Sequence, residues 1–287
     1  CVKFIYVNLR SEFPMKKLKK TSIWILSISA SIYLIICGYM YLAQESLIFH
    51  PDQLSKSTTI SYGAKTEELM IKTADGKNLS CVISKTDSTS KGLVFFLHGN
   101  AGNLTNQKEA ANFYNQLGYD FFTMDYRGFG KSEGEITSEE QFFEDIETTF
   151  DHVSKGYSKK EVIVIGYSVG TAPAAMIASR KNPAGLVLIA PYYSLINMTN
   201  RNYPYIPSFL LKYRFETNEF VKKTKSPIFL VHGDNDDILP FEGSKMLSNF
   251  LKKKDRFVPI QGQDHNNFEE NIVYRSNLVN FLSACQQ

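Results

Sequence analysis

The pentapeptide GYSVG at 166–170 constrains the fold of this chain more than any other segment. It follows the β-branched run VIVI at 162–165 and precedes the small-residue stretch TAPAAMIA at 171–178. A serine between two glycines, placed between a strand and a helix, is typical of a nucleophile elbow, because glycines permit a turn too tight for larger side chains. The following helix points its N-terminal amides at the place where negative charge develops. The pattern predicts that Ser168 is a nucleophile, and the alternative is a plain strand–helix turn with a surface serine.

A serine nucleophile needs a base, and the base needs an acid that orients it. In this arrangement the acid and then the histidine follow the serine along the chain. Of the five histidines, only His265 follows the loop at 232–240 that carries the candidate acids. It lies in the polar turn GQDHNN at 262–267, between an apolar strand and the last helix. We therefore predict that His265 is the base, and the alternative is a surface loop histidine.

Several aspartates can supply the acid. Asp234, Asp236 and Asp237 all lie in the loop after an apolar strand. Any of them could accept a hydrogen bond from the imidazole Nδ1, so the residues alone do not separate them. Asp264 directly precedes His265, but neighbouring side chains on an extended turn diverge, which disfavours it.

A small-residue loop follows an earlier apolar strand. The sequence HGNAGN at 98–103 comes directly after LVFFL at 93–97. Its small residues let a backbone N–H approach a reacting carbonyl, and the N–H of Val169 can be the second donor of an oxyanion hole. We assign the first donor to Asn100, with Ala101 as the alternative.

Strands and helices alternate along most of the chain. A hairpin is predicted over 67–85, around ADGK at 74–77. The apolar patterns then predict strands near 93–97, 119–125, 161–166, 185–190, 227–232 and 256–260, and helices near 104–117, 138–154, 169–181, 241–252 and 268–283. This alternation indicates an α/β fold whose mainly parallel central sheet has helices on both faces, with ligands at the carboxyl ends of the strands.

Together these motifs resemble the α/β-hydrolase superfamily. The segments that carry the resemblance are HGNAG at 98–102, DYRGFGKS at 125–132, GYSVG at 166–170, the Asp236 loop and the His265 turn. The chain is similar to membrane-anchored serine hydrolases related to Bem46 and to palmitoyl-protein thioesterases of the α/β-hydrolase-domain type. The resemblance implies an α/β-hydrolase fold with a short cap, and esterase or thioesterase activity. It also implies a triad of Ser168, Asp236 and His265, with Asp237 as the fallback acid.

An aromatic-rich segment at 191–227 interrupts the alternation. In the superfamily that the chain resembles, an insertion here forms a cap over the site. Because this one is short, we expect a shallow, partly open pocket, and we assign Tyr192 and Tyr193 to substrate binding, since an aromatic lining suits an acyl chain. The alternative is that these aromatic residues form the ordinary core of a small helical insert.

A second strong signal is the segment 23–43, which contains no Asp, Glu, Lys or Arg. At ~1.5 Å per residue it would span about 30 Å, the thickness of a bilayer hydrocarbon core. Four lysines lie at 16–20, whereas the next lysine after the segment is Lys56. The positive-inside rule then predicts a single-pass membrane protein whose hydrolase domain is non-cytoplasmic. A cleaved signal peptide is the alternative.

The predicted organisation starts with two short segments. They are a tail at 1–22, of which 1–14 precede a natural-looking start at Met15, and the transmembrane anchor at 23–43. A linker at 44–66 and a hydrolase domain at 67–287 with its cap at 191–227 follow.

Composition limits the partners of the chain. A net charge of +3 is too small to indicate nucleic-acid binding, and the spacing of the four cysteines fits no zinc or redox motif, so no metal or cofactor is expected. The expected partners are a small acyl ester or acylated substrate, and membrane lipid through the N-terminal anchor.

Three functions fit these observations. Hydrolysis of an ester or thioester through an acyl-enzyme fits best. Peptide hydrolysis, as in serine aminopeptidases of this fold, is disfavoured because the short cap shows no obvious acidic cluster for a substrate amine. A catalytically idle, membrane-tethered binding protein is disfavoured by the intact order of serine, acid and histidine.

Overall fold

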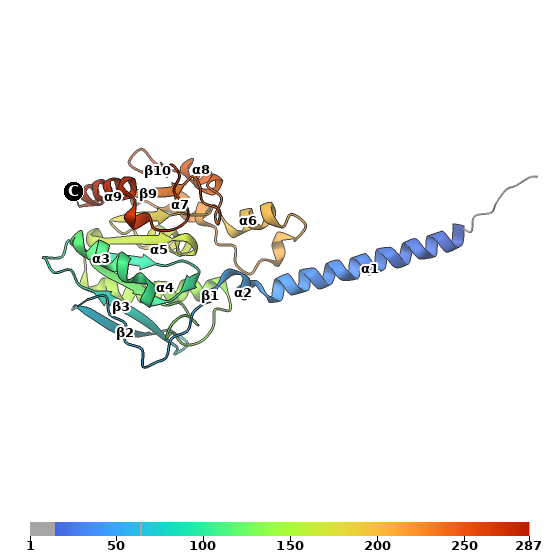
Figure 1. The fold of residues 1–287 in the computed structure, drawn as a ribbon, viewed down its shortest axis with the longest axis horizontal. Helices are drawn as coiled ribbons and strands as arrows, with labels where there is room; N and C mark the ends of the chain where they lie inside the picture. The colour runs from blue at the N-terminus through green and yellow to red at the C-terminus, as the bar shows by residue number, and fades with distance from the viewer. Residues whose placement is uncertain (1–14, 64, 287) are drawn as a thin grey trace, which may run out of the picture. The chain divides into compact units, whose positions relative to one another are not determined.

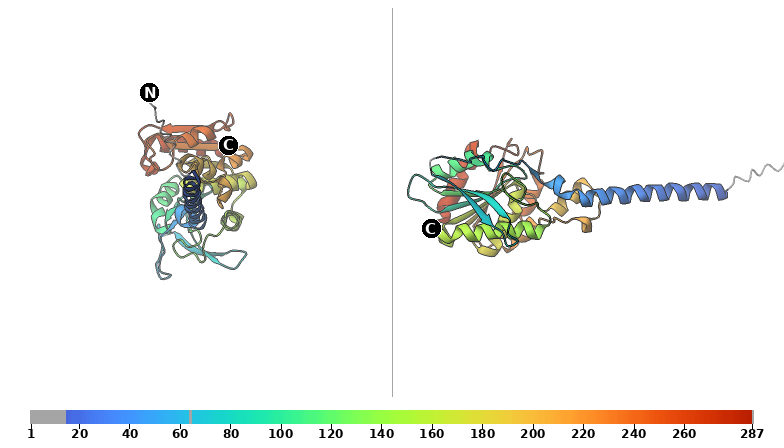
Figure 2. Two further views of the ribbon diagram at one scale, coloured as in Figure 1. Left: turned by 90° about the vertical axis from the view of Figure 1, so that its right-hand side faces the viewer. Right: turned by 90° about the horizontal axis from the view of Figure 1, so that it is seen from below.

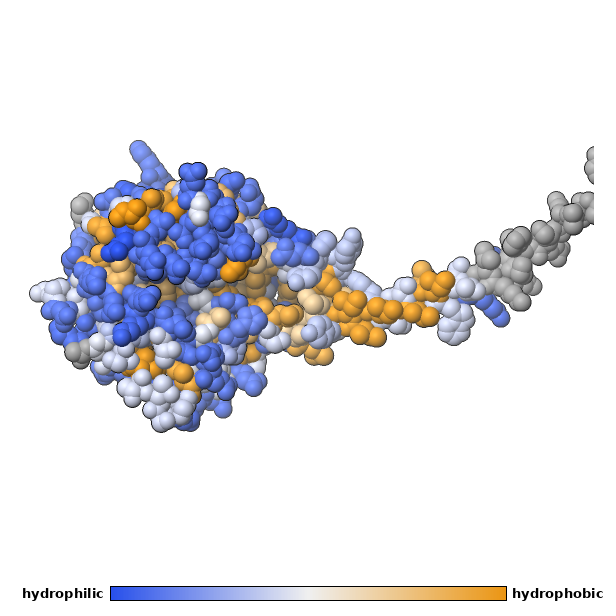
Figure 3. Space-filling model, in the orientation of Figure 1, coloured by the Kyte–Doolittle hydropathy of each residue, from blue (hydrophilic) through white to orange (hydrophobic). Residues whose placement is uncertain are grey.

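The computed structural model describes residues 15–63 and 65–286, and the chain divides into two compact units with a boundary between Ala43 and Gln44. The described part of the first unit is one helix, α1 (Met15–Leu42). Its portion Lys19–Leu42 is long and apolar enough to cross a membrane, and apolar residues recur along it (Figure 3). The predicted tail at 1–14 lies outside the described residues.

The second unit is built on an eight-stranded sheet (Figure 1). Its strands are, in spatial order, β10 (Arg256–Ile260), β9 (Ile228–Gly233), β8 (Gly185–Ile189), β7 (Val162–Tyr167), β4 (Leu93–Leu97), β6 (Asp120–Met124), β3 (Asn78–Ser84) and β2 (Thr66–Lys72). β3 runs antiparallel to β2 and β6, and the other neighbouring strands are parallel. The carboxyl ends of the parallel strands therefore meet at one edge, as the alternation of strands and helices predicts.

Helices cover both faces of this sheet (Figure 2). One face packs against α4 (Glu139–Val153), α5 (Thr171–Lys181), α7 (Thr217–Lys223) and α8 (Glu242–Ser248), and the other against α3 (Lys108–Gln116) and α9 (Ile272–Cys285). The strand β4 shows why. Phe95 joins the core that contains Phe142 of α4, whereas Phe96 joins the core that contains Tyr114 of α3 and Tyr274 of α9. Successive side chains point to opposite faces, so a wholly apolar strand needs a cover on each.

The remaining elements are short. The helices α2 (Gln44–Ile48) and α6 (Leu195–Asn202), the strands β1 (His50–Pro51) and β5 (Ala101–Gly102), and six 3₁₀ turns complete the described chain. These turns are η1 (Leu104–Gln107), η2 (Ser154–Gly156), η3 (Lys159–Glu161), η4 (Ser168–Gly170), η5 (Ser208–Leu210) and η6 (Phe268–Glu270).

The described residues of 44–66 pack as part of the second unit and do not form a linker, so that prediction is wrong. They contain α2 and β1, and β1 pairs in parallel with β5. Phe49, Ile60 and Tyr62 are at most 4 % exposed. Burying an apolar side chain of this size contributes about 1.5–3 kcal/mol, and this contribution explains why the segment packs against the unit.

Candidate active site

Ser168 lies on a strained turn between β7 and α5. Its φ of 53° falls in the left-handed region, which costs a non-glycine residue about 1–3 kcal/mol. A Cβ at position 166 would come within 2.4 Å of the Gly170 carbonyl oxygen, and one at position 170 within 2.2 Å of the Leu97 carbonyl oxygen. Both glycines are therefore required by close backbone approach. The Thr171 hydroxyl donates to the Ser168 carbonyl oxygen at 2.6 Å and holds the turn.

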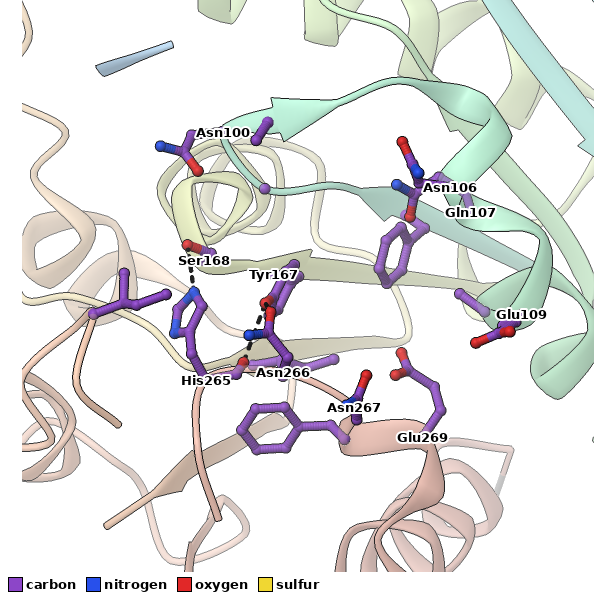
Figure 4. Close-up of a pocket in the computed structure, with 17 residues that line it drawn as sticks. Asn100, Asn106, Gln107, Glu109, Tyr167, Ser168, His265, Asn266, Asn267 and Glu269 are labelled. Carbon is purple, nitrogen blue, oxygen red and sulfur yellow. Dashed lines mark hydrogen bonds between the residues drawn. The ribbon is translucent and has the colours of Figure 1, made fainter. Parts of the chain in front are cut away.

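The structure brings the three predicted triad residues together at the carboxyl edge of the sheet. His265 Nε2 lies 3.1 Å from Ser168 Oγ (Figure 4), and His265 Nδ1 lies 2.6 Å from Asp236 Oδ2. With its proton on Nδ1, the neutral imidazole donates to Asp236 and accepts from the Ser168 hydroxyl. Ser168 and His265 are 7 % and 4 % exposed, so these contacts are largely shielded from water.

The other candidate aspartates lie elsewhere. Asp237 is exposed. Asp234 accepts a hydrogen bond from the Gly262 N–H at 2.6 Å, and Asp264 accepts one from the Asn266 N–H at 3.0 Å. Of the four aspartates considered, only Asp236 meets the imidazole of His265.

The Asp236 carboxylate accepts four hydrogen bonds. Oδ2 accepts from His265 Nδ1 and, at 2.9 Å, from His232 Nε2, while Oδ1 accepts from the N–H groups of Ile238 and Leu239. Burial alone would raise the pKa of Asp236, but the hydrogen bonds from His232, His265 and the Leu239 N–H hold this pKa well below its usual range. The carboxylate therefore stays ionised and can stabilise an imidazolium on His265.

His232, at the end of β9, is a site residue that the sequence analysis missed. Its side chain is fully buried, and its Nδ1 lies 2.6 Å from Ser244 Oγ. The Ser244 hydroxyl in turn lies 3.2 Å from the Pro191 carbonyl oxygen. These contacts orient the ring, and the ring holds the same carboxylate oxygen that orients His265. The usable signal was a histidine at a strand end, four residues before the acid.

The loop predicted to form the oxyanion hole is fixed by His98. The His98 Nδ1 lies 2.8 Å from the Gly99 carbonyl oxygen, and because a trans peptide opposes its N–H and C=O, the Asn100 N–H points away from that ring. The Asn100 carbonyl oxygen accepts from the His50 N–H at 2.7 Å. Val169 follows Ser168 in η4, the turn that leads into α5. The donor roles of Asn100 and Val169 stay predictions.

His98 itself is buried in an aromatic environment. Its ring centroid lies 4.3 Å from that of Tyr126, and its Nε2 has no hydrogen-bond partner among the described residues. Burial lowers the pKa of His98 to about 4, although its contact with the Gly99 carbonyl opposes this shift. The imidazole is therefore neutral at physiological pH.

A pocket of about 420 Å³ lies beside Ser168 (Figure 4). Much of its wall is polar, and the polar side chains come from Asn100, Asn106, Gln107, Glu109, Tyr167, Asn266, Asn267 and Glu269. Phe96, Ile189, Ile238 and Phe268 supply apolar surface. The Tyr167 hydroxyl lies 2.8 Å from Asn266 Oδ1 and 3.1 Å from the His265 carbonyl oxygen, so it braces the turn that carries the base.

Two carboxylates line the end of the pocket opposite Ser168. Figure 4 shows Glu109 and Glu269 on this side, from α3 and η6. Burial, together with the negative charges of Glu109 and Glu270, raises the pKa of Glu269. The expectation that the short cap supplies no acidic cluster is not contradicted, because neither carboxylate belongs to the segment 191–227. An acidic group for a substrate amine is instead available from α3 and η6.

Tyr192 and Tyr193 do not line this pocket, so their assignment to substrate binding is wrong. Tyr192 is 3 % exposed and its hydroxyl donates to the Val169 carbonyl oxygen at 3.3 Å. Tyr193 packs near Phe250, with ring centroids 6.3 Å apart. No residue of 191–227 belongs to the described lining of the pocket. The segment instead divides into buried aromatics, such as Tyr213, and side chains that face solvent.

Comparison with known proteins identifies related sequences. A family model described as serine aminopeptidase S33 matches residues 88–217. Human alpha/beta hydrolase domain-containing protein 17B is 26% identical over 240 residues, which cover 80% of this chain and 81% of that protein. Mouse alpha/beta hydrolase domain-containing protein 17C is 26% identical over 227 residues, which cover 76% of this chain and 68% of that protein.

Solved structures share the fold. An esterase from Pyrococcus furiosus has a TM-score of 0.66 and 19% identity, and the match covers 84% of this chain and 98% of the esterase. Est1E from Butyrivibrio proteoclasticus, solved with ferulic acid bound, has a TM-score of 0.63 and 19% identity over 75% of this chain and 98% of its own. These matches show the α/β-hydrolase fold that the strand pattern predicts.

Proposed function

Because the chain is a hydrolase of the α/β-hydrolase superfamily, we propose that it cleaves carboxylic ester or thioester bonds through an acyl-enzyme on Ser168. The observation that carries the proposal is the continuous contact from Ser168 Oγ to His265 (3.1 Å) and on to Asp236 (2.6 Å). Both distances lie within hydrogen-bond reach, as a nucleophile, its base and an orienting acid require.

The reaction follows from this geometry. His265 Nε2 takes the proton as Ser168 Oγ attacks the carbonyl carbon, and the N–H groups of Asn100 and Val169 stabilise the oxyanion. The bond to the leaving group breaks as His265 returns the proton to that group. A water molecule, deprotonated by His265, then attacks the acyl-serine, and the acid leaves as Ser168 regains its proton. Asp236 remains ionised throughout and stabilises the imidazolium.

The pocket favours a short or polar acyl group over a long alkyl chain. Its wall carries amides and carboxylates, and an apolar chain placed against them would bury polar groups without partners. A series of p-nitrophenyl esters and matching thioesters, with two to sixteen carbons, tests this. We expect kcat/KM to be highest for short chains, and S168A to abolish all turnover. A maximum at the long-chain end would contradict the inferred acyl preference, and absence of turnover for every substrate would contradict the activity itself.

A second candidate is the hydrolysis of a peptide or amide with a free amine, and the pair Glu109 and Glu269 favours it. A substrate ammonium placed beside this pair would favour the ionised carboxylate of Glu269 and bind to it. Aminoacyl p-nitroanilides with free and acetylated amines separate the two functions. If the amine is bound there, E269Q should lower kcat/KM for the free-amine substrate while leaving the acetylated one unchanged. Equal rates on both would exclude this candidate.

We also propose that α1 anchors the protein in a membrane, with the hydrolase unit on the non-cytoplasmic side. The support is the apolar stretch Lys19–Leu42 and the lysines before it. The protein should resist carbonate extraction, and protease outside spheroplasts should digest the hydrolase unit. Extraction would contradict the anchor, and digestion only after lysis would contradict the orientation.

A further inference from the structure

Aromatic side chains are exposed on the loop between α6 and α7. We call residues 203–211 the aromatic loop. Tyr203 is 54 %, Tyr205 83 % and Phe209 82 % exposed, whereas Tyr213 just beyond is fully buried. Covering a phenylalanine side chain contributes about 1.5–3 kcal/mol, so this surface gains stability if an apolar phase covers it. Figure 1 shows α6 and the loop at one edge of the hydrolase unit.

The place of the aromatic loop is tied to the point where the chain leaves α1. The buried Gln44 side chain donates to the Leu210 carbonyl oxygen and accepts from the Lys212 N–H, both at 2.8 Å. The next residue, Glu45, accepts from Lys212 Nζ at 3.1 Å and from the Tyr213 hydroxyl at 3.1 Å. The first two residues of the hydrolase unit are therefore held against the C-terminal end of the loop.

Covalent continuity limits how far Gln44 can lie from the end of the apolar stretch. The stretch able to cross a bilayer ends at Leu42, and only Ala43 separates it from Gln44. Two residues of chain reach at most about 7 Å, whatever the tilt of the helix. If α1 crosses a membrane, chain connectivity keeps the C-terminal end of the aromatic loop within reach of the headgroup region.

We infer that the aromatic loop inserts into the headgroup region of the same bilayer and forms a second lipid contact besides α1. This inference rests on the proposed anchor. Tyrosine and phenylalanine at this depth match the aromatic preference of the membrane interface. A second copy of the chain is a poorer occupant, because three aromatic side chains offer roughly 500 Å² of surface, below the ~800 Å² per partner of a stable interface. The contact would limit rotation of the hydrolase unit over the bilayer.

Tryptophan fluorescence in vesicles tests this inference with the full chain. Trp24 is the single tryptophan, so W24F removes the native signal. The W24F/F209W protein is reconstituted in phosphatidylcholine vesicles with and without brominated acyl chains. We expect the tryptophan at position 209 to emit at a shorter wavelength than free tryptophan in buffer. We also expect the brominated lipid to quench this emission roughly twofold or more.

The matched control is W24F/I272W. Ile272 is 75 % exposed and begins α9, which lies apart from α6 in the hydrolase unit (Figure 1). Its emission should be that of a tryptophan in water and should not respond to bromine. Equal quenching of the two variants, or short-wavelength emission at position 209 without quenching by bromine, would overturn the inference, the latter indicating a protein occupant.

Two further measurements on the same samples show whether the anchor, the loop contact or the proposed reaction has failed. Vesicle flotation reports the anchor, so protein that fails to float overturns the anchor and the loop contact together. Protein that floats without quenching overturns the loop contact alone. Labelling by a fluorophosphonate probe reports the catalytic site independently, so its loss would concern the proposed reaction and not the lipid contact.

Discussion

The sheet edge that carries Ser168, Asp236 and His265 differs from the aromatic loop in the burial and hydrogen bonding of its side chains. At the edge, the Asp236 carboxylate is buried and accepts four hydrogen bonds from within the hydrolase unit. In the loop, Phe209 is 82 % exposed, and the Gln44 side chain holds backbone groups at its C-terminal end. The first region is complete in itself, whereas the second gains stability only when something covers it. Changes at the triad should therefore alter chemistry, and changes in the loop should alter attachment.

The largest effect is expected from D236N. An amide at this position can favour the wrong imidazole tautomer of His265, so kcat should fall by about 10⁴. D237N, which changes an exposed neighbour, should retain nearly full activity. Steady-state kinetics on a short ester, with circular dichroism to verify folding, measures both. Equal losses in the two variants would remove Asp236 from the triad and break the contrast between a self-contained edge and its exposed surroundings.

A smaller loss is expected from H232F. Removing a hydrogen bond to a charged group costs about 1.5–3 kcal/mol, so kcat/KM should fall roughly tenfold to a hundredfold. Because the pKa of Asp236 rises when this donor is lost, its carboxylate becomes a stronger acceptor for the imidazolium of His265, and the acid limb of the pH profile should move to higher pH. H232Q, whose amide can replace the Nε2–H, should recover most of the activity. An unshifted pH profile, or no recovery in H232Q, would reduce His232 to a packing role.

The buried His98 predicts a dependence of stability on pH. Its pKa of about 4 lies below the unfolded value of about 6.5, so the unfolded chain takes up a proton first as the pH falls. This contribution to stability is complete above pH ~6.5 and is lost progressively down to pH ~4. Between pH 7 and pH 5, the native protein should lose about 2 kcal/mol more unfolding free energy than H98Q. Urea unfolding at both values measures this, and identical losses would show that His98 is not held neutral.

The smallest effect is expected in the aromatic loop. F209S changes an exposed side chain, so hydrolysis of a short, soluble ester should stay within about twofold of the native rate. The melting temperature should also be unchanged. A loss of turnover on the soluble ester comparable to that of H232F would place the loop in the substrate site and erase the distinction between the two regions.

Much of the fold could be predicted because local patterns determine it. Strands predicted at 93–97 and 256–260 coincide with β4 and β10, and the order of serine, acid and histidine matches three residues that the sheet edge brings together. The glycines around Ser168 carry this information because any Cβ there meets backbone. Where backbone segments approach too closely for a side chain, the glycine that is required can be recognised in a single sequence.

The errors concern contacts between distant segments. The linker prediction for 44–66 was wrong because β1 pairs with β5, about fifty residues away, and two-residue strands leave no periodic pattern. Tyr192 and Tyr193 were assigned to the pocket from the aromatic composition of their segment. Composition does not show whether the side chains of an insertion point into the pocket or into the core. His232 was missed because its role lies in sharing a carboxylate with His265, and only the folded arrangement shows that contact.

The central claim is that Ser168 is the nucleophile of a hydrolytic site. The most direct test is to treat the full-length protein with a fluorophosphonate probe and to locate the adduct by peptide mass spectrometry. We predict one adduct on Ser168 in the native protein, and no labelling of S168A even though S168A folds normally. An adduct on another residue, or labelling that persists in S168A, would contradict the account.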